Sequence, residues 1–202
     1  MRTLGVLVIA AVLFCAGCGD QVVAQHSPGH RPSPGSSGGA GGVTDAGIRL
    51  TGGGTLVAPA PRASAIVYDT ALVPPGAEVT VTAESGAVLS TSTVVVKGML
   101  PARTYGVHLH VDPCGLKPDD AGAHYRSAHS HTDAQASAEN EVWLDLTTDA
   151  RGDATATTTQ DWAFSAGRPP GSLVIHAEPT RTAGTEAGSA GSRVACVTLV
   201  KR

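Results

Sequence analysis

Short runs rich in β-branched residues, separated by turn-forming residues, make up the sequence from about residue 61 onward. The run Ala77–Thr82 alternates apolar and polar residues with a period of two, as a half-buried strand does. Similar runs occupy residues 65–68, 91–96, 107–111, 141–146, 154–158, 173–177 and 194–200. No segment combines a helical apolar period with helix caps. Around eight short strands predict an all-β fold, either an antiparallel sandwich or a Greek-key barrel.

The composition excludes several classes of protein. At 202 residues with 42% hydrophobic residues, the chain is long enough for one domain with a buried core. The formal net charge is −3, from 14 basic and 17 acidic residues that are spread evenly, so we expect no nucleic-acid partner. No apolar run beyond the N-terminal segment approaches the roughly 18 residues of a membrane span.

The N-terminal residues are typical of an export signal. A short basic start precedes the apolar stretch 4–16, which overlaps the sequence Cys15-Ala16-Gly17-Cys18. Small residues before a cysteine resemble a bacterial lipoprotein signal, so we expect residues 1–17 to be removed and Cys18 to carry the lipid. The alternative is an ordinary secretory signal cut near Ala24. Both alternatives predict an extracytoplasmic protein, either lipid-anchored to the outer face of the cell membrane or secreted.

A segment with little to bury follows the signal. Residues 26–42 contain 13 Gly, Pro or Ser among 17 positions, which favours disorder over a packed structure. We therefore predict a flexible tether over residues 18–60 and a single domain over residues 61–202. His26 and His30 lie in this tether, where we expect them to be solvated.

Two cysteines remain once the signal and the lipidation site are set aside. They are Cys114 and Cys196, far apart in the sequence. Outside the cytoplasm, two such thiols form a disulfide by default, so we predict this bridge as a structural staple.

The run Val107–Val111 carries a pattern with chemical meaning. Side chains two residues apart share one face of a strand, so His108 and His110 point the same way, about 6.6 Å apart along the strand. Two imidazoles on one face can bind one metal ion, although an exposed strand with two solvated histidines is the alternative. Further histidines follow: His124, His129 and His131 in the strandless segment 112–140, and His176 in a later strand.

Several of these elements together resemble the copper/zinc superoxide dismutase family. The elements are Gly106–His110, Cys114-Gly115, Ala123-His124-Tyr125, Val174-Ile175-His176 and Ala190–Cys196, in this order. The resemblance spans roughly residues 62–200. It implies an eight-stranded Greek-key β-sandwich or barrel with long metal-site loops.

The resemblance also implies roles for individual residues. His108, His110, His124 and His176 match the family's copper ligands, and four imidazoles suit copper in both of its oxidation states. Arg193 matches an arginine that attracts and orients superoxide beside the copper. Cys114 and Cys196 match the family's disulfide. The implied activity is conversion of superoxide to dioxygen and hydrogen peroxide, with Arg193 and His124 as catalytic residues and His124 as the proton carrier.

The zinc half of the family's site does not transfer to this chain. The alignment places Glu139 at a zinc histidine and Val142 at the zinc aspartate, and valine cannot bind a metal. Three interpretations remain for His129 and His131: an incomplete zinc site with Asp133 or Glu139, solvated remnants, or groups that help load copper. On ligand count we predict a copper-only dismutase.

Two other functions fit parts of the pattern. One is a non-catalytic copper-binding lipoprotein for buffering or delivery, but a cation gains nothing from the fixed positive charge of Arg193. The other is a structural β-sandwich with relic histidines, but all four copper-type histidines keep their strand contexts. The chain has no nucleophile-elbow motif of a serine hydrolase. A homodimer is compatible with the sequence but nothing in it requires one.

Overall fold

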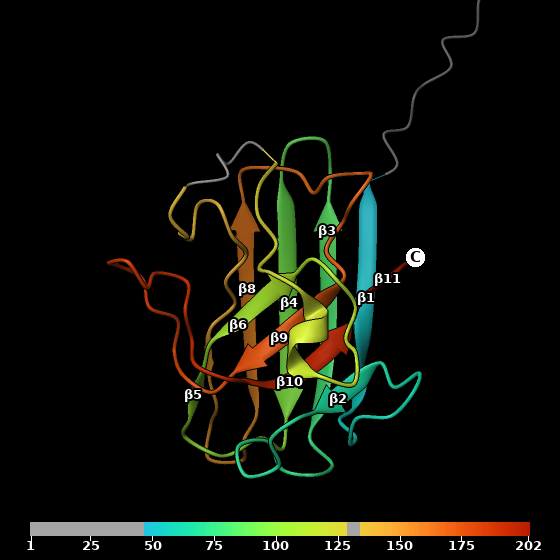
Figure 1. Ribbon diagram of the computed structural model, residues 1–202, viewed down its shortest axis with the longest axis vertical. Coiled ribbons are helices and arrows are strands. Elements are labelled where there is room, and N and C mark those ends of the chain that lie inside the picture. The colour runs from blue at the N-terminus through green and yellow to red at the C-terminus, as the bar shows by residue number, and fades with distance from the viewer. Residues whose placement is uncertain (1–46, 129–133) are drawn as a thin grey trace, which may run out of the picture. The chain divides into compact units, whose positions relative to one another are not determined.

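Two antiparallel sheets form the two layers of the domain (Figure 1). The computed structural model describes residues 47–128 and 134–202. The first sheet has the order β11 (Val200–Lys201), β1 (Ile48–Thr55), β3 (Glu78–Ser85), β4 (Ser90–Lys97) and β8 (Ala154–Gln160). The second has the order β2 (Ala65–Val67), β10 (Arg193–Thr198), β9 (Ser172–His176) and β6 (Val107–His110). A small separate pair joins β5 (Thr104–Tyr105) to β7 (Leu146–Thr147).

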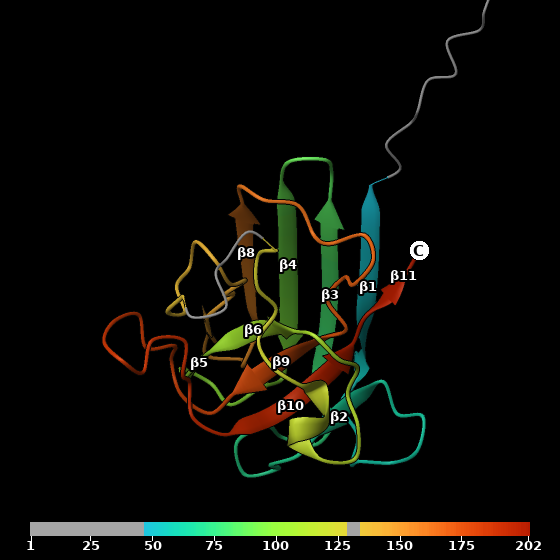
Figure 2. The ribbon, with the colours of Figure 1, turned by 45° about the horizontal axis from the view of Figure 1, so that its top comes forward.

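The strands of the second sheet cross those of the first obliquely, and the core lies between the layers (Figure 2). The first sheet supplies alternate residues of β3 and β4, such as Val81 and Val94, which are fully buried while their neighbours face outward. The second sheet supplies Leu109, Ile175 and Val197. Burial of each such side chain contributes about 2 kcal/mol to folding. The predicted all-β sandwich is confirmed.

Strands β6 and β9 are buried along their whole length, in contrast to the half-buried strands of the first sheet. One face of β6 packs into the core through Val107 and Leu109. The other face carries His108 and His110, and the segments around residues 124 and 143 form isolated bridges to the edge of β6 that does not pair with β9. The fold therefore buries polar side chains here, and this arrangement positions the site described below.

The predicted end of the tether at residue 60 is wrong, because β1 lies inside that segment. This strand pairs with β3 over all eight of its residues, and Leu50 and Leu56 are buried in the core. In this strand Gly52 and Gly53 allow neighbouring strands to pack closely. A Cβ on Gly52 would lie 2.5 Å from the carbonyl oxygen of Thr198, closer than real Cβ atoms approach.

The strand predicted over residues 141–146 is much shorter in the structure, where only Leu146 and Thr147 form β7. One cause is visible at Asp145, whose Oδ1 accepts the backbone N–H of Val107 at 3.2 Å. A side-chain oxygen thus takes a place that a ladder carbonyl would fill in a regular strand. The segment before β7 is therefore extended but is not part of a continuous sheet.

Two long connections are strandless in their described parts, and for the first of them this confirms the prediction from the sequence. The first, 112–140, contains the short 3₁₀ helix η1 (Pro118–Ala121). The second, 178–192, follows β9 and leads into β10. Within residues 47–128 and 134–202, no helix is long and apolar enough to cross a membrane.

The predicted disulfide between Cys114 and Cys196 is present and joins the first long connection to β10. A small apolar cluster surrounds it, with Ala121 of η1 and Val174 of β9 fully buried. The bridge thus fixes η1 against the second sheet.

We predict that the double substitution Cys114→Ser/Cys196→Ser lowers the free energy of unfolding by about 4 kcal/mol, because the bridge closes a long loop in the unfolded chain. Urea denaturation measures the loss. Dithiothreitol should destabilise the wild type by a similar amount and leave the double variant unchanged. An equal effect of dithiothreitol on both proteins would contradict a stabilising role of this bridge.

Candidate metal centre

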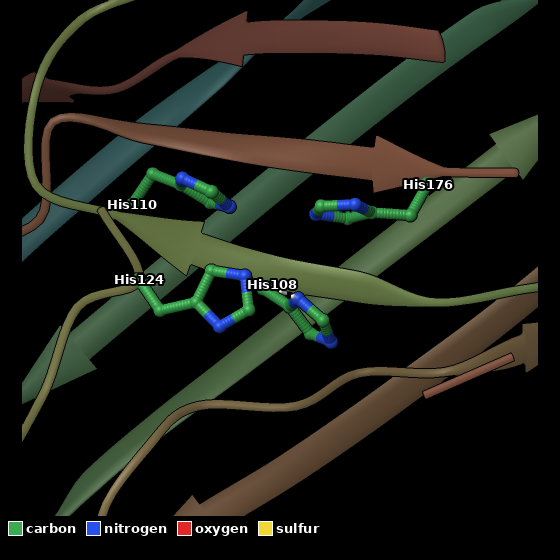
Figure 3. A group of neighbouring side chains, drawn as sticks. All are labelled: His108, His110, His124 and His176. Atoms are coloured by element: carbon green, nitrogen blue, oxygen red, sulfur yellow. Dashed lines mark hydrogen bonds between the residues drawn. The ribbon is translucent and has the colours of Figure 1, made fainter. Parts of the chain in front are cut away.

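Four histidines from three segments of the chain converge on one point (Figure 3). His108 and His110 project from the outer face of β6, and His176 stands at the end of the neighbouring strand β9. His124 comes from the loop that bridges to His110. One ring nitrogen from each of the four lies within 4.8 Å of the others. The structure thus brings together all four residues that the sequence predicts as copper ligands.

An acceptor group contacts the outer nitrogen of three of these rings. Nδ1 of His110 lies 3.1 Å from the carbonyl oxygen of Gly122, and Nδ1 of His176 lies 3.3 Å from that of Gly191. Nδ1 of His124 lies 2.7 Å from Oε2 of Glu141. Carbonyl and carboxylate oxygens only accept hydrogen bonds, so each of these nitrogens carries the proton. In a neutral ring the opposite nitrogen, Nε2, then has a free lone pair.

His108 also carries one proton, but on Nε2 and not on Nδ1. Its Nε2 lies 2.7 Å from Oγ1 of Thr180, and that hydroxyl donates to Oδ1 of Asp145 at 2.6 Å. Because the hydroxyl proton goes to the carboxylate, Thr180 accepts the proton of His108 Nε2. The free lone pair of His108 is therefore on Nδ1.

The inner nitrogens lack partners that would satisfy their lone pairs. Nε2 of His110 and Nε2 of His176 are buried and make no hydrogen bond. Nδ1 of His108 and Nε2 of His124 face each other at 3.1 Å, and with neutral rings no proton lies between them. Buried polar atoms of this kind are rare unless a ligand uses them. Four converging imidazole lone pairs fit a copper ion well.

Burial keeps three of the rings neutral, those of His108, His110 and His176. Removal from water lowers the pKa of His110 from 6.5 to about 2 and that of His176 from 6.5 to about 4. The pKa of His108 is also lowered strongly by burial and by the neighbouring histidines. The rings are therefore unprotonated at neutral pH, which is the form that binds a metal.

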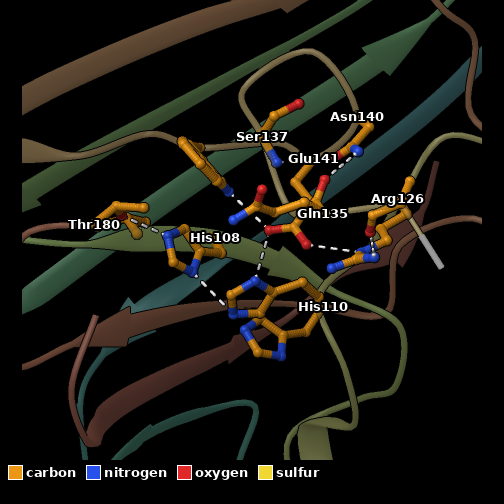
Figure 4. A network of polar contacts seen from close by, with 12 residues as sticks. His108, His110, Arg126, Gln135, Ser137, Asn140, Glu141 and Thr180 are labelled. Carbon is orange, nitrogen blue, oxygen red and sulfur yellow. Dashed lines mark hydrogen bonds and ion pairs between the residues drawn. The ribbon is translucent and has the colours of Figure 1, made fainter. Parts of the chain in front are cut away.

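Glu141 belongs to the site, although the sequence analysis did not select it. Its side chain is 1% exposed, and besides His124 it accepts hydrogen bonds from Nε1 of Trp143 and Nε of Arg126, each at 2.8 Å (Figure 4). Burial alone raises the pKa of Glu141, but the bond from His124 and the Arg126 charge outweigh it and lower the pKa. A signal existed in the sequence, because Val142 and Leu144 are core residues and their alternation turns Glu141 and Trp143 towards the histidines.

The predicted zinc residues form no site in the described part of the chain. Glu139 is exposed, and Val142 is buried in the hydrophobic core, where it cannot serve as a ligand. His129, His131 and Asp133 lie outside the described residues. Within residues 47–128 and 134–202, the four histidines are the only group with the composition and geometry of a metal site.

Arg193 lies at the start of β10, directly opposite His176 in the register of β9 and β10. Its Nη1 donates to the carbonyl oxygen of Pro118 in η1 at 3.1 Å, and its side chain is 21% exposed. Its positive charge contributes to the lowered pKa of His176. A guanidinium held in this way places a fixed positive charge beside the centre, within reach of solvent.

An antiparallel β-sandwich that carries a largely buried four-histidine cluster and an adjacent arginine defines the class of this protein. A comparison with protein families matches residues 76–199 to copper/zinc superoxide dismutase (SODC). The chain belongs to this family. A search of curated proteins finds no match.

We predict that the free energy of unfolding of the metal-free protein falls as the pH is lowered from about 6.5 to about 4. In this window His176 takes up a proton in the unfolded chain but not in the folded one, because its folded pKa is about 4. This residue alone accounts for a loss of about 3 kcal/mol. Urea denaturation across this range measures the slope, which should be shallower in His176→Gln. Constant stability across the window would contradict a neutral, buried His176.

Proposed function

We propose that this protein is an extracytoplasmic superoxide dismutase that works with copper alone. The observation that carries the proposal is the hydrogen bond between His124 and Glu141. A carboxylate at 2.7 Å requires a proton on Nδ1 of His124, so this nitrogen is not available to a second metal ion. His124 then contributes Nε2 to the copper and does not bridge two metals.

The overall reaction consumes two superoxide ions and two protons and produces dioxygen and hydrogen peroxide. Copper, when bound, would supply the one-electron redox chemistry that this reaction needs. His108, His110 and His176 would hold the ion through their free nitrogens. Arg193 attracts the anionic substrate and orients it by charge and hydrogen bonding.

His124 is suited to deliver a proton to the reduced substrate. A proton taken up at its Nε2 makes the ring an imidazolium, and the buried carboxylate of Glu141 stabilises that charge from the Nδ1 side. Arg126 binds the second oxygen of Glu141 and keeps the carboxylate in place. In this proposal Glu141 orients His124, which a second metal would otherwise do, and its negative charge stabilises the imidazolium form of the ring.

The location outside the cytoplasm has independent support. The disulfide between Cys114 and Cys196 indicates an oxidising compartment. The N-terminal motif with Cys18 favours a lipid anchor at the outer face of the membrane, although this segment lies outside the described residues. Detergent-phase partitioning of the wild type and of Cys18→Ser tests the anchor, since only the wild type should enter the detergent phase.

The activity is tested by pulse radiolysis of the copper-loaded protein after removal of zinc with a chelator. We expect fast second-order decay of superoxide at catalytic protein concentrations, with no change on addition of zinc. The metal-free and zinc-loaded proteins serve as controls. Decay no faster than spontaneous disproportionation would refute the proposal and leave a copper-binding lipoprotein. A rate that depends on added zinc would refute the copper-only part.

We predict that Arg193→Ala lowers the rate constant for superoxide by roughly tenfold or more, because the fixed charge that steers the anion is lost. Copper content should not change, and the dependence of the rate on ionic strength should weaken. Arg193→Lys, which keeps the charge, should retain an intermediate rate. Loss of copper from Arg193→Ala would instead assign this residue a structural role through its contact with η1.

A further inference from the structure

The loop 178–192 contacts the histidine cluster at two points, through the carbonyl of Gly191 at His176 and through the hydroxyl of Thr180 at His108. Thr180, 9% exposed, lies two residues into this loop, and its Oγ1 is 2.7 Å from Nε2 of His108. Asp145, from the segment before β7, accepts both the hydroxyl of Thr180 at 2.6 Å and its backbone N–H at 2.7 Å. Two segments far apart in the sequence thus meet behind one ligand ring, as the contact between Thr180 and His108 in Figure 4 indicates.

The contacts of Asp145 fix the direction of the hydrogen bond between His108 and Thr180. Its Oδ1 also accepts the backbone N–H of Val107, the residue before His108, at 3.2 Å. The carboxylate is therefore anchored to β6 itself, and it holds Thr180 at both its backbone and its side chain. As a result the Thr180 hydroxyl can only accept from His108, which keeps the proton on Nε2 and the lone pair on Nδ1.

Glycines permit the loop to approach this closely. A Cβ on Gly106 would lie 2.5 Å from Cβ of Ala190 and 3.0 Å from Oγ1 of Thr180, and the Gly106 N–H donates to the carbonyl of Glu178 at 2.8 Å. Gly188, with a φ of +85°, would bring a Cβ within 2.7 Å of Cβ of Ala136. The loop is therefore packed against β6 at one end and against the residues around Glu141 further along.

We propose that Thr180 and Asp145 form a positioning pair for His108, so that docking of the loop 178–192 and binding of copper stabilise each other. A metal on Nδ1 requires the proton on Nε2 and polarises that N–H, which strengthens its bond to Thr180. Because the coupling is a free energy, it acts in both directions: a docked loop raises copper affinity, and bound copper favours the docked loop. The proposal rests on the copper site of the proposed function but not on dismutase activity.

The loop carries its own reporter of docking. Arg181 follows Thr180 directly, and its side chain is 57% exposed, so trypsin can cut after it once the backbone is released. In the docked loop the backbone N–H of Arg181 donates to Ser189 and its carbonyl accepts from Gly188, which restrain this bond. Arg151 lies in the exposed turn before β8 and provides an internal control site.

The experiment measures two quantities on the full chain, with Cu(II) as the probe: the dissociation constant by chelator competition, and the rate of tryptic cleavage after Arg181. In the wild type, copper should slow cleavage after Arg181 at least several-fold and leave cleavage after Arg151 unchanged. Thr180→Val keeps the shape of the side chain but removes the acceptor. We expect it to weaken copper binding by roughly 10- to 100-fold and to abolish the protection.

Matched variants separate positioning from general damage. Thr180→Ser keeps the hydroxyl and should restore both affinity and protection, whereas Thr182→Val, an exposed change in the same loop, should behave as wild type. The proposal is overturned if copper does not protect Arg181 in the wild type, or if Thr180→Val retains wild-type affinity. The wild-type comparison decides the matter even if Thr180→Val fails to fold. If copper binds but does not slow cleavage after Arg181, only the proposed role of Thr180 and Asp145 is refuted. If copper does not bind at all, the proposed function is refuted as well.

Discussion

The metal centre depends on hydrogen bonds that hold a proton on the outward-facing nitrogen of each histidine. Each bond goes to an oxygen that cannot donate in return, so each ring is left with one lone pair directed inward. Two of these oxygens belong to the loop 178–192, at Thr180 and Gly191, and the other two belong to Gly122 and Glu141. The sandwich supplies the rigid strand β6, but the loops that it carries determine which nitrogen of each ring is free.

The site contains a buried carboxylate, that of Glu141, beside the ring of His124. A buried glutamate is costly unless it is paired, and here Arg126, His124 and Trp143 together satisfy Glu141. In the proposed mechanism its negative charge stabilises the imidazolium form of His124. The same group also ties the segment around residue 141 to the first long connection. One side chain thus has both an electrostatic role at the ligand and a structural role in the loop.

The sequence predicted much of this structure because alternation and motif order are local signals. Short runs rich in β-branched residues located the strands β3, β4, β6, β8 and β9, the cysteine count predicted the disulfide, and the resemblance selected the four histidines. Two kinds of feature could not be predicted from the sequence. The glycines of β1 have meaning only once Thr198 and Val79 lie against them. The partners Glu141 and Thr180 act through contacts between distant segments, and only folding brings those segments together.

The position of β1 also limits where the domain can be separated from its N-terminal segment. This strand lies between β11 and β3, inside the five-stranded sheet. A proteolytic cut before Gly47 would release the complete sheet, whereas a cut between β1 and β2 would remove an interior strand. The second product would expose the backbone edge of β3 beside its buried valines, and such an edge favours aggregation. The glycines of β1 thus mark the strand that a shed, soluble form of this domain must keep.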